Sequence, residues 1–427
     1  MTQPREFLEE LFRIAVAAAH PAQCLPAHLP PPPEEGRLIV LAAGKAAGAM
    51  TEVAERHYLA HLPASRIEGL AVTRHGYARP TTTIEVIEAG HPVPDAAGLA
   101  AAQRTIELAA TARRGDLVLV LMSGGASANW IAPAPGISLA EKQAVTRALL
   151  RSGANIGEIN TVRKHLSRIK GGRLAKLAHR GQLVTLAISD VPGDDPAVIG
   201  SGPTVPDPTT LADARAIVER FDIELPNSVR LALMDPDNET PKPGDALFRT
   251  TRFALVARPA DAFDAARRAV EAAGYECVFL GANIEGEARE VAASQAALAK
   301  AIQAEGRRAV ILSGGELTVT MRGNGRGGPN QEFALALALA LDGVRGICAL
   351  SADTDGTDGG AGSAEDPAGA YVDGHTAMQA RQSGLDPASF LAENNSTAFF
   401  SPLGSLVNSG PTCTNVNDFR AILVDRS

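Results

Sequence analysis

Residues 117–125 read Leu-Val-Leu-Val-Leu-Met-Ser-Gly-Gly, a continuous apolar run that ends in a glycine turn. A run of this length predicts a strand that is buried on both faces, as in parallel sheets covered by helices. Similar runs recur between longer amphipathic stretches, at residues 37–43, 182–189, 252–257, 309–312, 346–351 and 419–424. This alternation of strands and helices predicts an α/β protein built on parallel sheets.

A polar, proline-rich stretch at residues 234–245 interrupts this alternation. Because such a stretch is typical of a connection between folded units, we expect two domains, at residues 1–245 and 246–427. A strand followed by a glycine turn occurs on both sides of this boundary, ending at Gly125 and at Glu316. The repetition indicates two related α/β units.

Composition and charge exclude several classes of function. The chain has 40 Lys and Arg against 48 Asp and Glu, and its net charge of −8 disfavours binding to nucleic acid. The helical pattern at residues 7–19 carries charged side chains, so we expect no signal peptide. The longest apolar run, residues 333–341, is too short to span a membrane, and its Ala and Leu residues predict a buried helix. The cysteines are far apart, which favours reduced thiols and a cytoplasmic protein; they are Cys24, Cys277, Cys348 and Cys413.

Lys45 follows the first predicted strand, at the first turn of a helix. A cation is disfavoured at a helix N-terminus, so this position suits a lysine that binds an anion, although a solvated lysine explains the segment equally well. The segment is not a Walker P-loop, because Ala46 stands where the Ser or Thr would hold magnesium. Two glycine turns also suit an anion, since their small residues expose backbone N–H groups, although any tight turn also favours glycine. They are Ser123, Gly124 and Gly125, and Ser313, Gly314 and Gly315 with Glu316 beside them.

Two acidic loops follow predicted strands. Asp190 lies in the first, at residues 189–195, and Asp355 and Asp358 lie in the second, at residues 353–360. Carboxylates at the carboxyl end of a strand suit a hydrated magnesium ion or a substrate hydroxyl. A capped or solvated loop is the alternative interpretation for both.

Residues 323–328, Gly-Asn-Gly-Arg-Gly-Gly, match the G-x-G-x-x-G pattern of dinucleotide-binding loops and follow a strand-like stretch at residues 317–322. No strand ending in an acid follows about 20 residues on, which that fold requires. Arg326 instead suits bidentate binding of a phosphoryl group or a carboxylate. Three polar residues begin the helix that comes next, namely Asn330, Gln331 and Glu332.

Two further features have an ordinary structural interpretation beside a functional one. His91 is placed between glycine and proline in Gly-His-Pro-Val-Pro-Asp, where a core or capping role is at least as good as a role in binding. A run of basic residues on a predicted helix is most simply a solvated face, or it draws an anionic substrate toward a cleft. These residues are Arg163, Lys164, Arg168, Lys170 and Arg173.

Taken together and in this order, the motifs resemble the class II glycerate kinases of the MOFRL type. The resemblance covers nearly the whole chain, from about residue 7 to the C-terminus. Its motifs are Gly44-Lys45 and residues 90–95, 123–125, 189–194, 328–332, 353–359, 410–412 and 414–416. One position departs from the pattern, because Cys413 stands where the family has a second glycine.

The resemblance implies a D-glycerate 2-kinase that uses ATP and Mg²⁺ to form 2-phosphoglycerate and ADP. It also implies a larger Rossmann-like N-terminal domain, a smaller mixed α/β C-terminal domain, and an active site in the cleft between them. Carried over by motif, Lys45 and Arg326 are expected to be essential. We expect Lys45, Arg326 and Asp190 to be catalytic, and Lys45, His91, Arg326 and Asp355 to bind the acid. We also expect the two glycine turns, Glu316 and residues 330–332 to bind ATP, and Asp190, Asp355 and Asp358 to bind the metal. The sequence does not choose which carboxylate orients the hydroxyl and which binds magnesium.

Phosphoryl transfer agrees with this interpretation, because it needs cations around the moving group and donors that hold both substrates in line. Two alternatives stay open. The glycine loop at residues 323–328 favours an NAD(P)H-dependent hydroxypyruvate reductase, and a non-catalytic sensor of sugar acids or phosphosugars would need the same cleft. For each of these functions we expect small-molecule partners and no binding to nucleic acid or to a membrane. A homodimer is possible.

Overall fold

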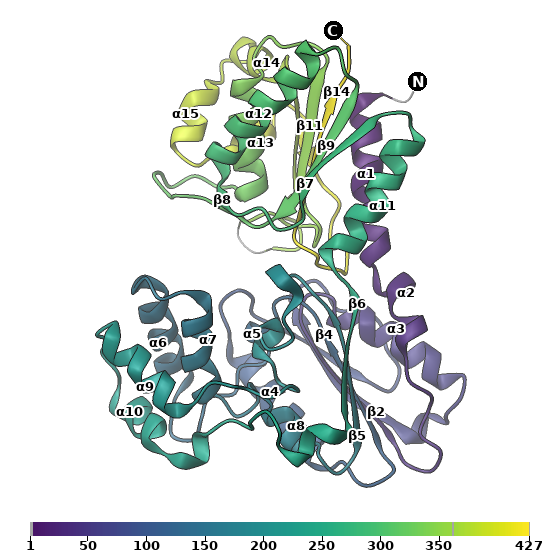
Figure 1. Ribbon diagram of the computed structural model, residues 1–427, viewed down its shortest axis with the longest axis vertical. Coiled ribbons are helices and arrows are strands. Elements are labelled where there is room, and N and C mark those ends of the chain that lie inside the picture. Colours follow the sequence, from purple (N-terminus) through teal and green to yellow (C-terminus); the bar gives the residue numbers. More distant parts are fainter. Residues whose placement is uncertain (1–2, 361–362, 427) are drawn as a thin grey trace. The chain divides into compact units, whose positions relative to one another are not determined.

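The computed structural model describes residues 3–360 and 363–426, and its elements are shown in Figure 1. The chain forms two compact units: residues 24–256 make the first, and residues 1–23 with residues 257–427 make the second. The expected division at residue 245 differs from this one in two respects. The N-terminal helix packs with the C-terminal part of the chain, and the proline-rich stretch precedes one more strand of the first sheet.

The first unit is built on a six-stranded sheet. Its strands are β1 (Leu38–Ala43), β2 (Ile67–Arg74), β3 (Glu85–Ala89), β4 (Leu117–Met122), β5 (Gln182–Ile188) and β6 (Thr251–Ala257). They lie in the order β3-β2-β1-β4-β5-β6, and the pairs from β3 to β5 are parallel. Strands β1 and β4 are buried along their whole length, which explains their continuous apolar sequences.

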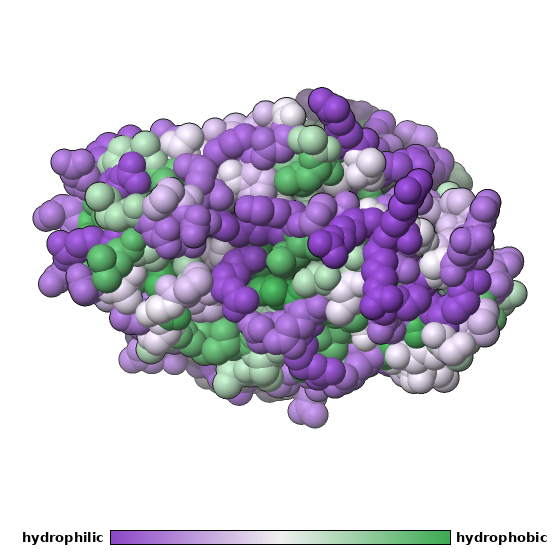
Figure 2. All heavy atoms as spheres, turned by 90° about the horizontal axis from the view of Figure 1, so that it is seen from below, coloured by the Kyte–Doolittle hydropathy of each residue, from purple (hydrophilic) through white to green (hydrophobic). Residues whose placement is uncertain are grey.

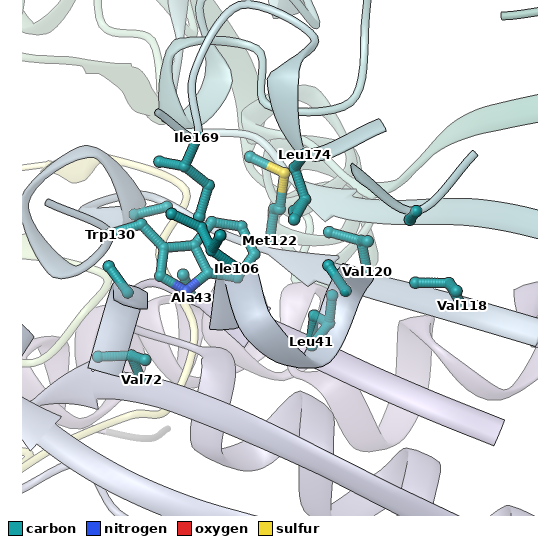
Figure 3. Packing of buried hydrophobic residues seen from close by; sticks show 14 of the residues in the cluster. Leu41, Ala43, Val72, Ile106, Val118, Val120, Met122, Trp130, Ile169 and Leu174 are labelled. Carbon is teal, nitrogen blue, oxygen red and sulfur yellow. The ribbon is translucent and has the colours of Figure 1, made fainter. Parts of the chain in front are cut away.

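Helices cover this sheet and also form a separate helical layer. The helices that follow its strands are α3 (Ala47–Leu59), α4 (Ala96–Ala110), α5 (Ala126–Asn129) and α8 (Arg173–Leu177). Figure 3 shows the Trp130 indole packed among Ile106, Met122 and Ile169, in a core to which α4, α5 and α8 contribute. A second core joins α6 (Leu139–Arg151), α7 (Ile156–His165), α9 (Leu211–Arg220) and α10 (Asn227–Met234).

The second unit is built on a mixed sheet. Its strands are β7 (Glu276–Gly281), β9 (Ala309–Gly315), β11 (Ile347–Asp353), β12 (Gly369–Asp373), β13 (Leu406–Val407) and β14 (Asp418–Val424), in the order β13-β12-β11-β14-β9-β7. Figure 1 shows α1 (Pro4–Ala19) and α11 (Pro259–Ala272) on one side of this sheet, with α12 (Ala288–Ala304) and α13 (Pro329–Ala340) on the other. Three short helices and a two-stranded pair complete the unit: α14 (Thr376–Gln382), α15 (Pro387–Ala392), α16 (Ser396–Phe400), β8 (Gly286–Glu287) and β10 (Leu317–Thr318).

The expectation of parallel sheets from the strand pattern is wrong for this second unit, whereas the mixed α/β C-terminal domain implied by the resemblance is confirmed. Strands β7 and β9 are parallel, but β9, β14, β11, β12 and β13 pair in antiparallel fashion. Helices cover both faces of the central strands, so these strands are apolar throughout, as parallel strands are. The apolar sequence pattern reports that a strand is buried on both faces, and it is the same for parallel and antiparallel strands. The helix expected at residues 333–341 is confirmed within α13.

The surface agrees with the composition. Figure 2 views the molecule from below and shows hydrophilic side chains over most of that face, with small apolar patches between them. Among the described residues, no helix combines the length and the apolar character that crossing a bilayer requires. The four cysteines all lie in the described part of the chain and form no disulfide.

Helix α1 provides a direct test of the division into units. Leu8 and Leu11 are fully buried on it, whereas Glu10 is exposed. We expect Leu11→Ala to lower the free energy of unfolding of the second unit by about 2–5 kcal/mol, since it opens a cavity against that unit's sheet. Hydrogen exchange of the β11 and β14 amides measures this effect, and Glu10→Ala is the control. Unchanged protection of these amides in Leu11→Ala would contradict the assignment of α1 to this unit.

Candidate active site

Four of the residues expected in the site lie at one edge of the first sheet. In a parallel sheet the carboxyl ends of the strands meet at the same edge. Lys45 follows β1, His91 follows β3, Gly125 belongs to the turn after β4, and Asp190 follows β5. The parallel pairing of these strands therefore gathers residues that are up to 145 positions apart in the sequence, from Lys45 to Asp190.

The turns after β1 and β4 bind each other through their backbones. The Lys45 amide donates to the Gly124 carbonyl at 2.8 Å, and the Ala46 amide donates to Ser123 Oγ at 2.9 Å. Gly44 has a φ of +122°, and a Cβ at this position would lie 2.4 Å from Ser123 Oγ. Glycine at residue 44 is therefore required for this contact. Ser123 Oγ, which was expected to bind ATP, accepts a backbone hydrogen bond that fixes the start of α3.

Lys45 and His91 meet at Gly125. A Cβ on Gly125, whose φ is +85°, would lie 2.9 Å from the His91 Cδ2 atom and 3.3 Å from Lys45 Cγ. The ring and the lysine stem therefore both lie against this glycine, and both side chains are partly buried. Among the described residues, the amide N–H groups of Gly124 and Gly125 donate no hydrogen bond to the protein. A cation, an imidazole and two available amides at one edge form a site suited to an anion.

Asp190 completes this edge on the far side of β4. Because β4 lies between β1 and β5, the turns that carry Lys45 and Asp190 are two strand spacings apart, about 10 Å. Asp190 is partly buried, and the preceding Ser189 is fully buried. A carboxylate at this distance from a lysine can face a small substrate from the opposite side.

In the second unit, Asp358 holds the start of α13. Its Oδ1 accepts from the Asn330 amide at 3.0 Å, and its Oδ2 accepts from the Gln331 amide at 2.8 Å. The side-chain amides of Asn330 and Gln331 also donate to it, at 3.2 and 3.1 Å. Burial raises the pKa of Asp358 to about 7, and the nearby Asp418 charge shifts it in the same direction. Asp358, Asn330 and Gln331 thus cap a helix, in a place where we expected a metal ligand and ATP contacts.

Arg326 is mostly exposed in the second unit. Its side chain retains 64% of its accessible surface and pairs with Asp366 at 3.2 Å. Its loop is fixed from behind, since the Arg326 amide donates to Asn395 Oδ1 at 3.2 Å and the Gly325 amide to the Glu393 carbonyl at 3.0 Å. An ion pair this exposed contributes little stability, so Arg326 can exchange Asp366 for an anionic ligand.

The expected glycine turn at Ser313, Gly314 and Gly315 is wrong. These residues belong to β9 and pair with β14. The strand expected next, at residues 317–322, is also shorter than predicted, because β10 covers only Leu317–Thr318. Ser313 Oγ bonds to Gln295 at 3.1 Å and to the buried Arg420 at 3.3 Å. This contact assigns Ser313 to the core of the second unit.

The two glutamates expected near ATP lie in different surroundings. Glu316 is exposed. Glu332 is buried, pairs with Arg289 and accepts from Asn394 at 3.1 Å, while burial raises the pKa of its carboxyl group. Glu332 therefore connects α13 to its neighbours.

The carboxylates expected to bind magnesium belong to two different units. Within the described ranges, no group of three His, Cys, Asp or Glu side chains is arranged to hold a metal ion. Asp190 lies in the first unit, and Asp355 and Asp358 lie in the second. Asp355 Oδ1 accepts from the Thr357 amide at 2.8 Å. Magnesium in nucleotide enzymes takes one or two carboxylates together with substrate phosphates, and Asp358, whose oxygens already cap α13, is poorly suited to that role.

The interpretation of the basic run as a solvated helix face is wrong for Lys164 and Lys170, whereas Arg168 is exposed. Helix α7 ends at His165, and both Lys164 and Lys170 are buried. Lys164 lies 3.5 Å from Asp207, and Lys170 Nζ donates to the Ser127 carbonyl at 2.9 Å. A lysine with polar neighbours in the sequence is normally exposed to solvent, and for this reason the sequence did not predict that these two are buried.

Two other buried cations were also missed. Lys142 is 2% exposed on α6, and no pattern in its segment distinguishes it from the exposed residues beside it. Arg420 is fully buried in β14 and pairs with Asp418 at 2.9 Å. Here a signal was available, since a charged residue inside an apolar strand needs a buried partner.

Comparisons with known proteins agree with this organisation. The family described as Domain of unknown function (DUF4147) matches residues 7–234, and the MOFRL family matches residues 309–418. A protein of Agrobacterium vitis with the provisional name hydroxypyruvate reductase is 47% identical over 98% of this chain and 94% of its own length. The D-glycerate 2-kinase of Thermotoga maritima is 40% identical over 90% of this chain and 89% of its own length. The crystal structure of a glycerate kinase from that organism has a TM-score of 0.85 and 37% identity, covering 98% of this chain and 99% of that one.

The helix cap at Asp358 leads to a prediction about pH. Its pKa is about 7 in the folded protein and about 3.9 in an unfolded chain, so the folded state binds the extra proton between these values. The free energy of unfolding should therefore fall as pH rises from about 4 to about 7, by up to about 1.4 kcal/mol per pH unit, and then level off. Urea unfolding followed by circular dichroism at a series of pH values measures this slope.

Asp358→Asn should remove this contribution, so the difference in stability between wild type and variant changes across the same pH range. Asp386→Asn is the control, because Asp386 caps α15 at the surface. A wild-type slope that persists in Asp358→Asn would show that Asp358 does not carry the proton.

Proposed function

Because this chain belongs to the class II glycerate kinases of the MOFRL family, we propose that it transfers the γ-phosphoryl group of ATP to the 2-hydroxyl of D-glycerate. The bond from the substrate oxygen to phosphorus forms, the bond between the β–γ bridging oxygen and phosphorus breaks, and the hydroxyl proton leaves. The products are 2-phosphoglycerate and ADP. The observation that carries the proposal is the meeting of Lys45 and His91 at Gly125, beside two available amides.

Lys45 is the first cation proposed to act on the phosphoryl group. Its backbone is fixed by the bond to Gly124, so the start of its side chain has a defined direction. Charge on the transferred phosphoryl group needs stabilisation from donors that are already in place. The amides of Gly124 and Gly125 can bind oxygens of the same anion, in keeping with their expected role as nucleotide contacts.

Arg326 is the second proposed cation. Its exposed guanidinium carries the bidentate donors that match a phosphoryl group, and its loop is anchored by the contacts to residues 393 and 395. Since Asp366 already pairs with this guanidinium, the protein positions it before a ligand arrives. Lys45 belongs to the first unit and Arg326 to the second.

Asp190 is the proposed acceptor of the hydroxyl proton, since it lies beyond β4 from Lys45 at the same sheet edge. Asp190 or Asp355 would hold Mg²⁺, which when bound supplies further neutralisation of the phosphate charge. His91 would orient the acid through its ring nitrogens, from its place against Gly125.

The hydroxypyruvate reductase alternative gains no support from the glycine loop. A dinucleotide pyrophosphate needs backbone amides that point toward it. The amides of Gly323, Gly325 and Arg326 donate instead to Asn394, Glu393 and Asn395. The strand before the loop is also only two residues long, so the loop does not open a βαβ unit.

The proposed reaction is tested by mixing the protein with Mg-ATP and D-glycerate and following phosphorus by NMR. We expect resonances of 2-phosphoglycerate and ADP to appear together. A 3-phosphate product would correct only the position of transfer, whereas the absence of ADP would overturn the proposal. Loss of NADH absorbance that depends on hydroxypyruvate would favour the reductase.

Substitution of the two cations tests their assigned roles. We expect Lys45→Ala and Arg326→Ala to stay folded and to lower kcat by about a hundredfold or more, because each removes charge stabilisation from the transition state. Lys176→Ala and Arg322→Ala are matched controls, since both residues are exposed, in the same unit as the residue they match. Turnover close to wild type would remove that residue from the catalytic set. A sensor would show changed affinity with no turnover in any variant.

A further inference from the structure

A cavity of about 170 Å³ lies in the first unit, close to the candidate active site. Residues 92–94, helix α6, Arg163 and Lys170 contribute to its walls. The apolar part includes Pro92, Val93, Ala128 and Ile131. The polar part includes three cations, Lys142, Arg163 and Lys170, and we call this space the cationic cavity. Arg147 lies at its exposed rim.

No carboxylate balances these cations. The residues that line the cationic cavity include no Asp and no Glu. In the described part of the chain, no ion pair within 4.0 Å joins Lys142, Arg163 or Lys170 to an acid. Burial, together with repulsion by the other two cations, lowers the pKa of Lys170 well below its usual value. Three like charges around one space are costly unless an anion enters it.

Contacts within the protein use only part of what these cations can donate. Lys142 bonds to the carbonyls of Arg163 and Leu166 at 3.0 and 3.1 Å, and so caps the end of α7. Lys170 makes one such bond, to Ser127, although an ammonium has three donors. Arg163 makes a single long contact of 3.4 Å to Asn160, although a guanidinium has five donors. Helix capping therefore accounts for Lys142 but leaves donors on Lys170 and Arg163.

The chain connects this cavity directly to the candidate active site. Pro92, which lines the cavity, follows His91, and His91 contacts Gly125. Ser127, whose carbonyl accepts from Lys170, is two residues after Gly125 in the same turn and helix. The cavity walls and the groups at the candidate active site therefore come from the same short segments of the chain.

The size and the lining of the cavity restrict the ligand. Pockets for drug-sized molecules are about 300–1,000 Å³, so a cavity of about 170 Å³ suits a group of a few heavy atoms and excludes a nucleotide. Cations beside apolar walls suit a small organic acid, with its carboxylate on the cations and its carbon atoms against the apolar side.

We infer that the cationic cavity binds the carboxylate of the three-carbon hydroxy acid, through Arg163 and Lys170. The inference rests on the proposed function for the identity of the acid. It adds two residues that position the substrate, and neither takes part in phosphoryl transfer. It also explains why the protein keeps these cations without an acidic partner so close to the sheet edge.

The single tryptophan of the chain provides a binding assay that needs no turnover. Trp130 is buried between Ala128 and Ile131 in the sequence, and both of these line the cavity. D-glycerate, added without ATP, should change the fluorescence of Trp130 in a saturable way. Glycerol, which lacks the carboxylate, should leave it unchanged.

Arg163→Gln and Lys170→Gln should each raise the dissociation constant for D-glycerate by about tenfold or more, since each removes a charged hydrogen bond. Both should raise KM for D-glycerate and leave KM for ATP within about twofold, a separation that general loss of structure would not produce. Arg151→Gln is the matched control, because Arg151 is exposed at the end of α6 and does not line the cavity.

The outcomes separate this inference from the proposed function. Saturable binding of D-glycerate that is lost in Arg163→Gln supports the carboxylate site even if the wild type forms no phosphoglycerate. Turnover with an unchanged KM for D-glycerate in both variants would overturn the site while the kinase assignment stands. Inorganic phosphate that competes for the cavity more strongly than D-glycerate would also overturn it, because the cations would then serve a phosphoryl group.

Discussion

The contact on which the candidate site depends is the parallel pairing of β1 with β4. Their register places Ala43 opposite Met122, so the turns that follow emerge side by side. The bond from the Lys45 amide to the Gly124 carbonyl then fixes the two turns to each other. Lys45 and the amides at the start of α5 reach one place for this reason. The two turns lie so close together that position 44 must be glycine. The geometry of the site therefore depends on the pairing of the two strands.

Charged residues serve two different purposes in this protein. In the second unit, buried charges are satisfied by protein groups: Asp358 caps α13, and Arg420 pairs with Asp418. In the first unit, Arg163 and Lys170 face a cavity with donors to spare. Charges of the first kind stabilise the fold, and we assign charges of the second kind to ligand binding. An Asp-rich motif such as residues 353–360 can therefore stabilise the fold, as Asp358 does by capping α13.

Much of the fold follows from hydrophobic pattern alone, and the rest does not for identifiable reasons. Strand β4 begins at Leu117 and ends at Met122, where its apolar run begins and ends. The direction of the strands in the second sheet leaves no trace in the sequence, because helices bury both faces. Gly314 suggested a turn, yet it belongs to a strand in which a Cβ would lie 2.3 Å from the Phe263 ring, and only the packed structure shows that neighbour. Lys45 and His91 could be named from motifs, whereas Lys142 became visible only through its burial.

The central claim is that the acid binds at the carboxyl edge of the first sheet, between Lys45 and the cationic cavity. A crystal structure of the protein with D-glycerate tests it most directly. We expect electron density for the acid with its carboxylate within hydrogen-bond distance of Arg163 and Lys170, and its 2-hydroxyl directed toward Lys45 and Asp190. Density for the acid in the second unit, or away from this sheet edge, would contradict the account.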